Sequence, residues 1–293
     1  MNRRHFLHTT AGLAAGSLAW MSAGCASDGS SPSSNASGAA SSSGTNRLRA
    51  IGVQLYTLRS LMEDDFEGTL RAVADIGYDE VEFAGYYDRS PEEVRGLLDE
   101  LGLAAPSTHV PLNALQDDLD RVIQTAQTIG HEYVVCPWLP EAERGSIAGY
   151  RAIAQRFNDV GREMQAANLQ LGYHNHAFEF EMIDGQRPYD VLLDATDPAY
   201  VTMELDLYWI VEAGHDPLAY FERYPRRFAL SHVKDRTEDG AMVAVGAGAL
   251  DFANIFAHSD QAGLQKYVVE HDNPEDPLAS IRSSYDYLSQ FRF

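Results

Sequence analysis

The sequence predicts a single (β/α)8 barrel, and three observations support this fold class. Eight short apolar runs have the length and composition of buried parallel strands, helical stretches lie between them, and the alternation repeats at roughly 25 to 35 residues per unit. A doubly wound open sheet is the competing architecture, but no glycine-rich dinucleotide fingerprint follows the first run. The predicted strands span residues 50–56, 80–84, 105–110, 133–137, 169–174, 201–207, 228–233 and 267–270.

Helical stretches separate the predicted strands, and their ends carry suitable capping residues. Ser90 and Pro91 open one helix, Gly102 follows its last residue, and Gly77 and Gly130 follow the last residues of two others. Serine and proline favour the start of a helix, and glycine favours the left-handed residue that ends one. The predicted helices span residues 66–76, 91–101, 115–129, 146–168, 189–195, 217–223, 252–262 and 278–290.

Composition limits the classes of function. The chain has 293 residues, is 45% hydrophobic and 22% charged, and carries a formal net charge of −21. This predicts one acidic α/β domain with a full core. Because excess acid repels nucleic acid and anionic lipid headgroups, neither is an expected partner.

The first 25 residues are expected to be an export signal and not part of the fold. Residues 2–7 contain Arg3 and Arg4 in a pattern that resembles a twin-arginine signal, and a short apolar stretch follows. Residues 22–25 resemble a bacterial lipobox, which would place a lipid anchor on Cys25. Ser22 stands where leucine is common, so cleavage by an ordinary signal peptidase is the alternative. We expect an exported bacterial protein, either periplasmic or a membrane-anchored lipoprotein.

Residues 26–46 are expected to form a disordered Ser/Gly-rich linker, and residues 47–293 to form the barrel domain. The linker sequence cannot bury enough apolar surface to fold. The only cysteine besides Cys25 is Cys136, which lies in an apolar run and is expected to stay a buried thiol.

Polar residues stand at the ends of most predicted strands. Barrel enzymes place their active residues at the carboxyl ends of the strands, so these side chains are expected to converge. In strand order they are Gln54 and Tyr56, Glu82, His109, residues 174–179, Asp206, His232 and Glu270.

The last three strands supply candidate metal ligands. Glu204 and Asp206 share one face of the sixth strand, and an aspartate at the strand tip suits a hard divalent cation, although Asp206 capping the following loop is the alternative. His232 and Lys234 share one face of the seventh strand, where a lone histidine is more often a core residue. Glu270 ends the eighth strand, and a bound cation would offset the penalty of burying its charge.

The fifth strand carries the densest cluster of functional residues. His174 and His176 share its inner face, and Glu179 follows after the turn. Imidazole and carboxylate ligands without a thiolate indicate Mn, Mg, Co or Zn. The sequence therefore predicts a divalent metal ion as cofactor.

At these residues the chain resembles the xylose isomerase-like barrel family, the sugar phosphate isomerase/epimerase group that includes inosose dehydratases, hydroxypyruvate isomerases and ketose 3-epimerases. The resemblance covers about residues 50 to 290, and its motifs are specific only when taken together. They are residues 52–59 (GVQLYTLR), 76–83 (IGYDEVEF), 173–180 (YHNHAFEF), 204–209 (ELDLYW), 232–235 (HVKD), 245–248 (VGAG) and 269–272 (VEHD).

The resemblance implies four metal ligands. In the family, strands five and eight each supply a carboxylate, strand six an aspartate and strand seven a histidine, which implies Asp206, His232 and Glu270 here. The fifth-strand position departs from the family, because a histidine stands where the epimerases carry glutamate. The implied fourth ligand is Glu179, with His176 as its substitute.

The resemblance also implies enolisation chemistry on a sugar, in which a proton is removed next to a carbonyl that the metal polarises. Glu179 and Glu270 are the expected bases, with His176 and His109 as proton donors. Ordinary packing is the alternative for Trp209, and a salt bridge to a loop arginine for Glu82. The expected substrate contacts are Glu82, His109, His174, Trp209 and Lys234.

Export favours an unphosphorylated sugar or keto-sugar, because sugar phosphates are scarce outside the cytoplasm and Gly246 and Gly248 give only a weak sign of a phosphate cup. Isomerisation or epimerisation is the expected reaction. Elimination from a 3-keto-glycoside or an inosose-like substrate, supplied by a separate exported dehydrogenase, is the alternative. A noncatalytic sugar-binding lipoprotein is the second alternative.

Overall fold

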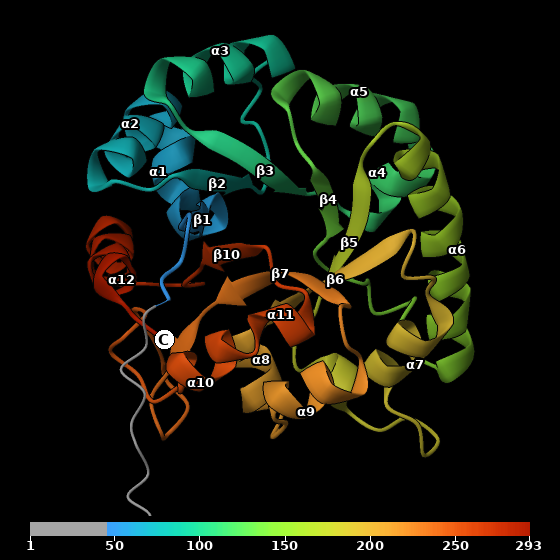
Figure 1. Ribbon diagram of the computed structural model, residues 1–293. Helices are drawn as coiled ribbons and strands as arrows, with labels where there is room; N and C mark the ends of the chain where they lie inside the picture. The colour runs from blue at the N-terminus through green and yellow to red at the C-terminus, as the bar shows by residue number, and fades with distance from the viewer. Residues whose placement is uncertain (1–45) are drawn as a thin grey trace, which may run out of the picture. The chain divides into compact units, whose positions relative to one another are not determined.

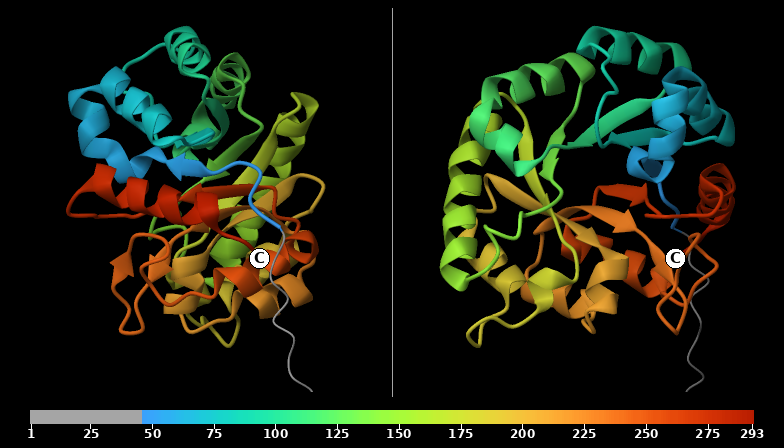
Figure 2. Two further views of the ribbon diagram at one scale, coloured as in Figure 1. Left: turned by 60° about the vertical axis from the view of Figure 1, so that its left-hand side comes forward. Right: turned by 180° about the vertical axis from the view of Figure 1, so that it is seen from behind.

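Eight parallel strands close into a barrel in the computed structural model, which describes residues 46–293. The strand order around the barrel is β1-β10-β7-β6-β5-β4-β3-β2, so neighbours follow the chain order and β10 closes on β1. Figure 1 shows helices around the outside of this ring, and Figure 2 shows the same barrel from two further sides. The predicted (β/α)8 fold is confirmed.

The barrel strands agree with the predicted runs to within two residues at each end. They are β1 Gly52–Gln54, β2 Glu80–Phe83, β3 Ala104–His109, β4 Tyr133–Cys136, β5 Gln170–His174, β6 Val201–Asp206, β7 Phe228–Val233 and β10 Lys266–Val269. The α-helices are α1 Arg59–Asp64, α2 Phe66–Ile76, α3 Pro91–Leu101, α4 Leu112–Asp117, α5 Leu119–Ile129, α6 Ile147–Ala166, α7 Pro188–Ala195, α8 Leu207–Glu212, α9 Pro217–Arg223, α10 Phe252–Ala257, α11 Ser259–Ala262 and α12 Pro277–Gln290.

The helix ends follow the local sequence. The Ser90 hydroxyl accepts the amide of Glu93 while the Glu93 carboxylate accepts the amide of Ser90, so α3 begins with a complete capping box. Gly77 ends α2 in the left-handed conformation at φ 115°, where a side chain would be strained. These short-range interactions explain why the helix positions could be predicted.

Several loop elements were not predicted. A 3-10 turn, η1 Leu55–Leu58, and helix α1 follow the first strand, and a two-stranded hairpin, β8 Asp235–Arg236 with β9 Met242–Val243, follows the seventh. The predicted helix over 115–129 is interrupted at Asp118, whose backbone is not helical (φ −149°, ψ 48°). These elements lie outside the repeating unit, so the strand and helix periodicity gives no sign of them.

The hydrophobic core has two parts. A large cluster fills the space between the barrel wall and the helices, and a small cluster of Tyr133, Val135 and Leu230 lies inside the barrel. Above this small cluster, toward the carboxyl ends of the strands, the barrel interior is filled by polar and charged side chains. Cys136 is fully buried on the helix-facing side, and burial raises the pKa of its thiol to about 12, as expected for an inert thiol.

Gly161 in α6 is required by close packing. A Cβ atom there would lie 2.6 Å from the backbone oxygen of Tyr200, whereas a Cβ at Gly96 in α3 would meet nothing within 4 Å. We expect Gly161→Ala to lower the free energy of unfolding by about 1 to 3 kcal/mol through overpacking. Gly96→Ala is expected to raise it by about 0.5 to 1 kcal/mol through helix propensity. Chemical denaturation measures the free energy of unfolding of both variants. Equal changes in the two variants would contradict the close packing at Gly161.

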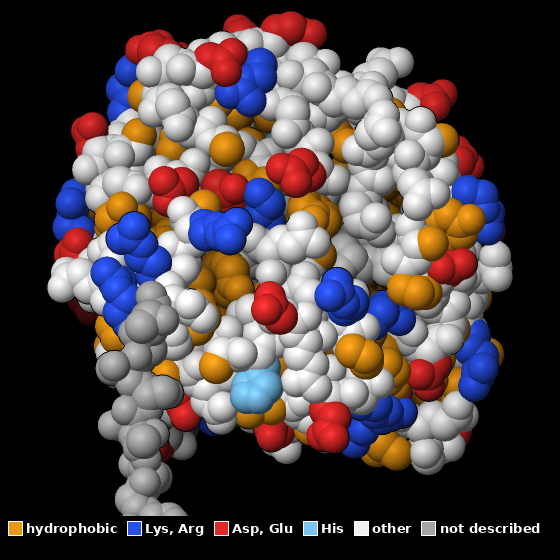
Figure 3. All heavy atoms as spheres, in the orientation of Figure 1, with side chains coloured by type: hydrophobic (Ala, Val, Ile, Leu, Met, Phe, Trp, Pro, Cys, Tyr) orange, Lys and Arg blue, Asp and Glu red, His pale blue; other side chains and the backbone are white. Residues whose placement is uncertain are grey.

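The ends of the described segment lie side by side, because Asn46 and Phe293 exchange two backbone hydrogen bonds of 3.1 Å. Within this segment no helix is both long and apolar enough to cross a bilayer. Figure 3 shows one face of the molecule, on which acidic and basic side chains are interspersed among uncharged ones. The expected signal segment and most of the expected linker lie outside the described residues.

Candidate active site and metal centre

Four side chains from consecutive strands β5, β6, β7 and the end of β10 meet at the carboxyl end of the barrel. They are His174, Asp206, His232 and Glu270, which we call the upper group, and one donor atom of each lies within 4.8 Å of those of the others. His174 Nε2 is 3.2 Å from Asp206 Oδ2, and His232 Nδ1 is 3.7 Å from the same oxygen. The strand register places these residues together, since Asp206 is level with His232 across β6 and β7.

His232 Nδ1 and Glu270 Oε2 lie 2.8 Å apart in the upper group, and both atoms are buried. Glu270 Oε2 is also 2.7 Å from the Lys234 ammonium, so it lies between an imidazole and a cation of the protein. Imidazole nitrogens and carboxylate oxygens gathered this closely are the ligand types that a divalent cation binds. Asp206 Oδ1 also accepts the amide of Trp209, so Asp206 caps α8 with one oxygen and faces the upper group with the other.

A second set of four side chains lies below the upper group in the barrel. Its members are Glu82, His109, Glu204 and, again, His232, and we call it the lower group. His232 Nε2 is 2.8 Å from Glu82 Oε1, and His109 Nε2 is 2.8 Å from Glu204 Oε2. His232 therefore faces the upper group with Nδ1 and the lower group with Nε2.

Lys234 fixes the carboxylates of the upper group. Its ammonium lies 2.9 Å from Asp206 Oδ2, 2.7 Å from Glu270 Oε2 and 2.8 Å from Asp272 Oδ1, and its side chain is only 1% exposed. Burial opposes its charge, but attraction by Asp206 and Glu270 outweighs burial and raises the pKa of Lys234. The lysine is held charged at ion-pair distance from three carboxylates, and it donates a hydrogen bond to Asp272 Oδ1.

The same interactions keep the upper carboxylates ionised. Burial would raise the pKa of Asp206 and of Glu270, but the Lys234 charge outweighs it and holds both pKa values well below their usual range. Burial and repulsion by His232 lower the pKa of His174 to about 4, so His174 is neutral near pH 7. Neutral imidazole and ionised carboxylate are the protonation states that bind metals.

The lower group holds its charges differently. Burial and repulsion by Glu82 raise the pKa of Glu204 to about 7. Burial opposes the charge on His109, but attraction by Glu82 outweighs it and raises the pKa of His109 to about 9. His232, which both groups share, also has a raised pKa, because attraction by Glu204 and Glu270 outweighs burial. A cation bound in either group would therefore displace protons.

Aromatic side chains surround the mouth of the site. The His176 ring lies 4.8 Å from the Trp138 ring and 5.6 Å from the Trp209 ring, measured between centroids, and Trp138 is 44% exposed. Burial and repulsion by His174 lower the pKa of His176 to about 2, and its buried Nδ1 has no hydrogen-bond partner. Rings with exposed faces are suited to stack against the apolar face of a sugar.

Glu179 does not lie with the upper group, so the expected role as fourth ligand does not fit. The residues after β5 form a 3-10 turn, η2 Phe178–Phe180, which carries the Glu179 side chain to the outer face of the strand. There its two oxygens accept the Tyr173 hydroxyl and the backbone amide of His176. Burial raises the pKa of Glu179 to about 8, so it is an uncharged structural acid and not an exposed base. His174 takes the fifth-strand position of the upper group instead.

Two expected substrate contacts also do not fit the geometry. The Glu82 carboxylate is completely buried beneath the upper group, where Gln54 donates to it at 2.6 Å, so it cannot reach a sugar in the mouth. Lys234 has no hydrogen left for a sugar hydroxyl, because three carboxylates occupy it. His109 lies in the lower group with its side chain 9% exposed, whereas Trp209 lies at the mouth as expected.

Glu204, Asp272 and Trp138 belong to this region but were not predicted as site residues. Glu204 shares its strand face with Asp206, so the alternation along β6 already contained the signal for it. Trp138 follows Pro137 after the end of β4, and an aromatic residue close to a strand end was the available sign. Asp272 follows Glu270, but only the fold shows that Lys234 reaches it.

The glycine-rich segment 245–248 encloses a carboxylate of the protein itself. The amides of Gly246 and Gly248 donate to Asp235 Oδ2 at 2.9 and 3.0 Å, and Leu250 donates to Oδ1. Asp235 is 1% exposed. These amides therefore stabilise a loop, and they are not available to a substrate phosphate.

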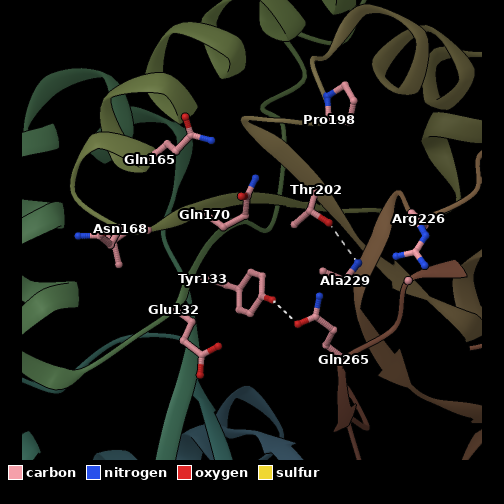
Figure 4. A pocket seen from close by; sticks show the side chains of 12 residues that line it. Glu132, Tyr133, Gln165, Asn168, Gln170, Pro198, Thr202, Arg226, Ala229 and Gln265 are labelled. Carbon is pink, nitrogen blue, oxygen red and sulfur yellow. Dashed lines mark hydrogen bonds between the residues drawn. The ribbon is translucent and has the colours of Figure 1, made fainter. Parts of the chain in front are cut away.

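A cavity of about 570 Å³ lies at the opposite end of the barrel (Figure 4). Its lining comes from the amino ends of the strands, with Gln170 of β5, Thr202 of β6 and Ala229 of β7 among the residues. The Tyr133 hydroxyl donates to Gln265 at 3.3 Å across it. Barrel enzymes carry their chemistry at the carboxyl ends of the strands, so this cavity is not the candidate active site.

The closed parallel barrel, with ionisable side chains gathered at the carboxyl ends of its strands, defines an enzyme-type (β/α)8 barrel. A family model described as xylose isomerase-like TIM barrel matches residues 70–291. The chain belongs to this xylose isomerase-like TIM barrel family, as its motifs predicted.

Known relatives agree with the family but are distant. An inosose dehydratase of Bacillus thuringiensis is 22% identical, with 78% of this chain and 88% of that protein aligned. The match to an inosose dehydratase of Clostridium beijerinckii, also 22% identical, spans 49% of this chain and about half, 52%, of that relative. A sugar phosphate isomerase/epimerase of Parabacteroides distasonis has a solved structure that superposes with a TM-score of 0.70 and 26% identity, covering 87% of this chain and 97% of that one. The IOLI protein with a bound zinc atom shares the fold, with a TM-score of 0.67, 14% identity, and 81% of this chain and 95% of that one covered.

Proposed function

We propose that this chain is a divalent-metal-dependent sugar isomerase or epimerase that removes a proton next to a carbonyl. The observation that carries the proposal is the upper group, in which one atom each of two imidazoles and two carboxylates, all buried, lies within 4.8 Å of the others. The zinc bound by IOLI, which shares the fold, supports a metal in this kind of barrel.

The residues of the upper group fit a metal of the Mn, Co, Zn or Mg type. Two imidazoles and two carboxylates would hold it, and a carboxylate oxygen that accepts Lys234 still has a lone pair for an ion. A bound ion would polarise a sugar carbonyl and stabilise the negative charge that develops when the neighbouring carbon loses its proton.

The chain's own groups would supply the remaining chemistry. Glu270 is ionised and His176 is neutral, so both are in the unprotonated form of a base, and the buried Nδ1 of His176 has no hydrogen-bond partner. Lys234 acts as a positioning residue that keeps Asp206 and Glu270 ionised and fixed. Trp138 and Trp209 would orient the sugar by stacking on its apolar face.

We propose an unphosphorylated sugar or keto-sugar as the substrate. Two cations near the mouth are already engaged, Lys234 by three carboxylates and Arg59 by the Asp272 carbonyl and Asn273. A third, Arg144, lies over the Trp138 ring. The segment 245–248 binds its own aspartate, so it gives no support for a phosphate site.

Export supports the same substrate class, because the twin-arginine-like residues 2–7 and the lipobox-like residues 22–25 favour a location outside the cytoplasm, with a lipid anchor on Cys25. Loss of membrane retention in Cys25→Ser is the check on the anchor. An exported sugar dehydrogenase acting upstream would supply a keto-sugar.

A lyase or dehydratase reaction is the second candidate, supported by the inosose dehydratases among the relatives. It begins with the same proton removal, and the loss of a β-substituent follows. A noncatalytic sugar binder is the third candidate, and it requires neither a bound metal nor proton exchange.

Solvent deuterium exchange tests the proposal. We expect the metal-loaded protein to exchange deuterium into the carbon next to the carbonyl for one or more members of a panel of keto-sugars. Chelation and Glu270→Gln should each abolish this exchange, and product analysis by NMR then separates isomerisation from elimination. Glu80→Gln is the matched control, since Glu80 pairs with Lys266 at the other end of β2. Sugar binding without metal and without exchange would instead identify the binder.

A further inference from the structure

The lower group has the dimensions of a coordination site. Its four donor atoms form a closed ring with edges of 3.1 Å (Glu82 Oε1 to His109 Nε2), 2.8 Å (His109 Nε2 to Glu204 Oε2), 3.3 Å (Glu204 Oε2 to His232 Nε2) and 2.8 Å (His232 Nε2 to Glu82 Oε1). Ligands about 2.1 Å from one ion and at right angles to each other lie about 3 Å apart. The ring is therefore of the size that a divalent cation requires.

Hydrogen bonds leave this ring incompletely satisfied. Each imidazole Nε2 carries at most one hydrogen, so the two histidines can donate along only two of the four edges. The edges with hydrogen-bond geometry are His109 to Glu204 and His232 to Glu82. Outside the ring, the second oxygens of the same carboxylates, Glu82 Oε2 and Glu204 Oε1, have no partner although both side chains are 0% exposed, so an ion would satisfy them only by binding both oxygens of each carboxylate. A buried carboxylate oxygen without a partner is destabilising.

The charges of the ring also favour a cation. Within residues 46–293, neither Glu82 nor Glu204 forms an ion pair with a lysine or an arginine, and the Gln54 amide is the further donor to Glu82. A divalent ion would offset both carboxylates at once. Protonated His109 and His232 are the competing explanation, since each lies within ion-pair distance of both carboxylates.

We propose that the barrel interior binds a second divalent cation of the Mn, Co or Zn type, held by Glu82, His109, Glu204 and Nε2 of His232. This inference deepens the proposed function, on which it rests through the shared His232, whose Nδ1 faces the upper group. His232 would then bind one ion through each nitrogen and release its remaining N–H proton to solvent. The upper and lower groups together would then form a two-ion metal centre.

Metal stoichiometry tests the proposal. The full chain is treated with a chelator and reloaded separately with Mn²⁺, Co²⁺ and Zn²⁺. Unbound ions are removed by gel filtration, and the bound metal is quantified by inductively coupled plasma mass spectrometry. We expect two ions per chain in the wild type and in Glu80→Gln. One ion is expected in Glu204→Gln and in His109→Asn, and one in Asp206→Asn.

A spectroscopic readout covers the case in which a variant fails to fold. In the wild type loaded with Mn²⁺, two ions that share one imidazole should give an exchange-coupled electron paramagnetic resonance spectrum in place of the six lines of an isolated ion. Loss of the coupling in Glu204→Gln would support the lower site.

The outcomes separate this inference from the proposed function. One ion per chain, kept in Glu204→Gln and lost in Asp206→Asn, overturns the second site and leaves the first. One ion lost in Glu204→Gln but kept in Asp206→Asn supports the lower site and overturns the proposed use of the upper one. No bound ion in the wild type overturns both.

Discussion

Asp206→Asn is expected to lower the metal affinity of the upper group by at least about 100-fold and to abolish proton exchange. This loss is larger than the roughly 10- to 100-fold that follows when a residue that only hydrogen-bonds to a metal ligand is replaced. Asp206 contributes the Oδ2 atom that faces both His174 and His232. An amide in its place has no negative charge and presents an NH₂ group or a neutral oxygen to the ion. Isothermal titration with Mn²⁺ and deuterium exchange into the active keto-sugar measure the two effects.

The control for this change is Glu80→Gln, which alters a carboxylate paired with Lys266 at the far end of the barrel. It should keep wild-type affinity and exchange. Asp206→Asn also keeps the oxygen that caps α8, but it removes one of the three carboxylates around the buried Lys234, so the free energy of unfolding is measured in parallel. Wild-type metal affinity in Asp206→Asn would remove the metal centre from the proposal.

Glu179→Ala is expected to lower the free energy of unfolding by about 2 to 5 kcal/mol while leaving metal affinity unchanged. The change removes the acceptor of the Tyr173 hydroxyl and of the His176 amide, and an unsatisfied buried donor costs about 1 to 3 kcal/mol. Glu179→Gln is the matched variant, because its amide oxygen can accept the His176 amide and its NH₂ group can donate to the Tyr173 oxygen. Urea denaturation with parallel Mn²⁺ titration measures both quantities.

The pH dependence of stability gives this prediction a second readout. Burial raises the pKa of Glu179 in the folded state from 4.5 to about 8, so the folded state holds a proton that the unfolded state releases. The stabilisation is complete below about pH 4.5 and declines as the pH rises toward 8, at up to about 1.4 kcal/mol per pH unit. Glu179→Gln should lack this part of the decline. If Glu179→Ala instead abolishes metal binding at full stability, Glu179 is a ligand after all.

The sequence alone specified the barrel wall and the kinds of atoms at its mouth. Strand and helix positions follow from local alternation, helical periodicity and capping residues such as Ser90 and Gly77, and all of these act within a few residues. The same alternation put Asp206 and His232 on inward faces at strand ends. For this reason the expectation that Asp206, His232 and Glu270 converge could be formed before any contact was known.

The tertiary structure decided which of these side chains meet. Sequence spacing does not set the stagger between neighbouring strands, and that stagger puts Asp206 level with His232 and Glu204 one step lower, level with Leu230. A single 3-10 turn after β5 moves Glu179 behind the strand and leaves His174 in the ligand position. Local patterns report the face of each strand, whereas depth in the barrel depends on hydrogen-bond register between segments that are distant in the chain.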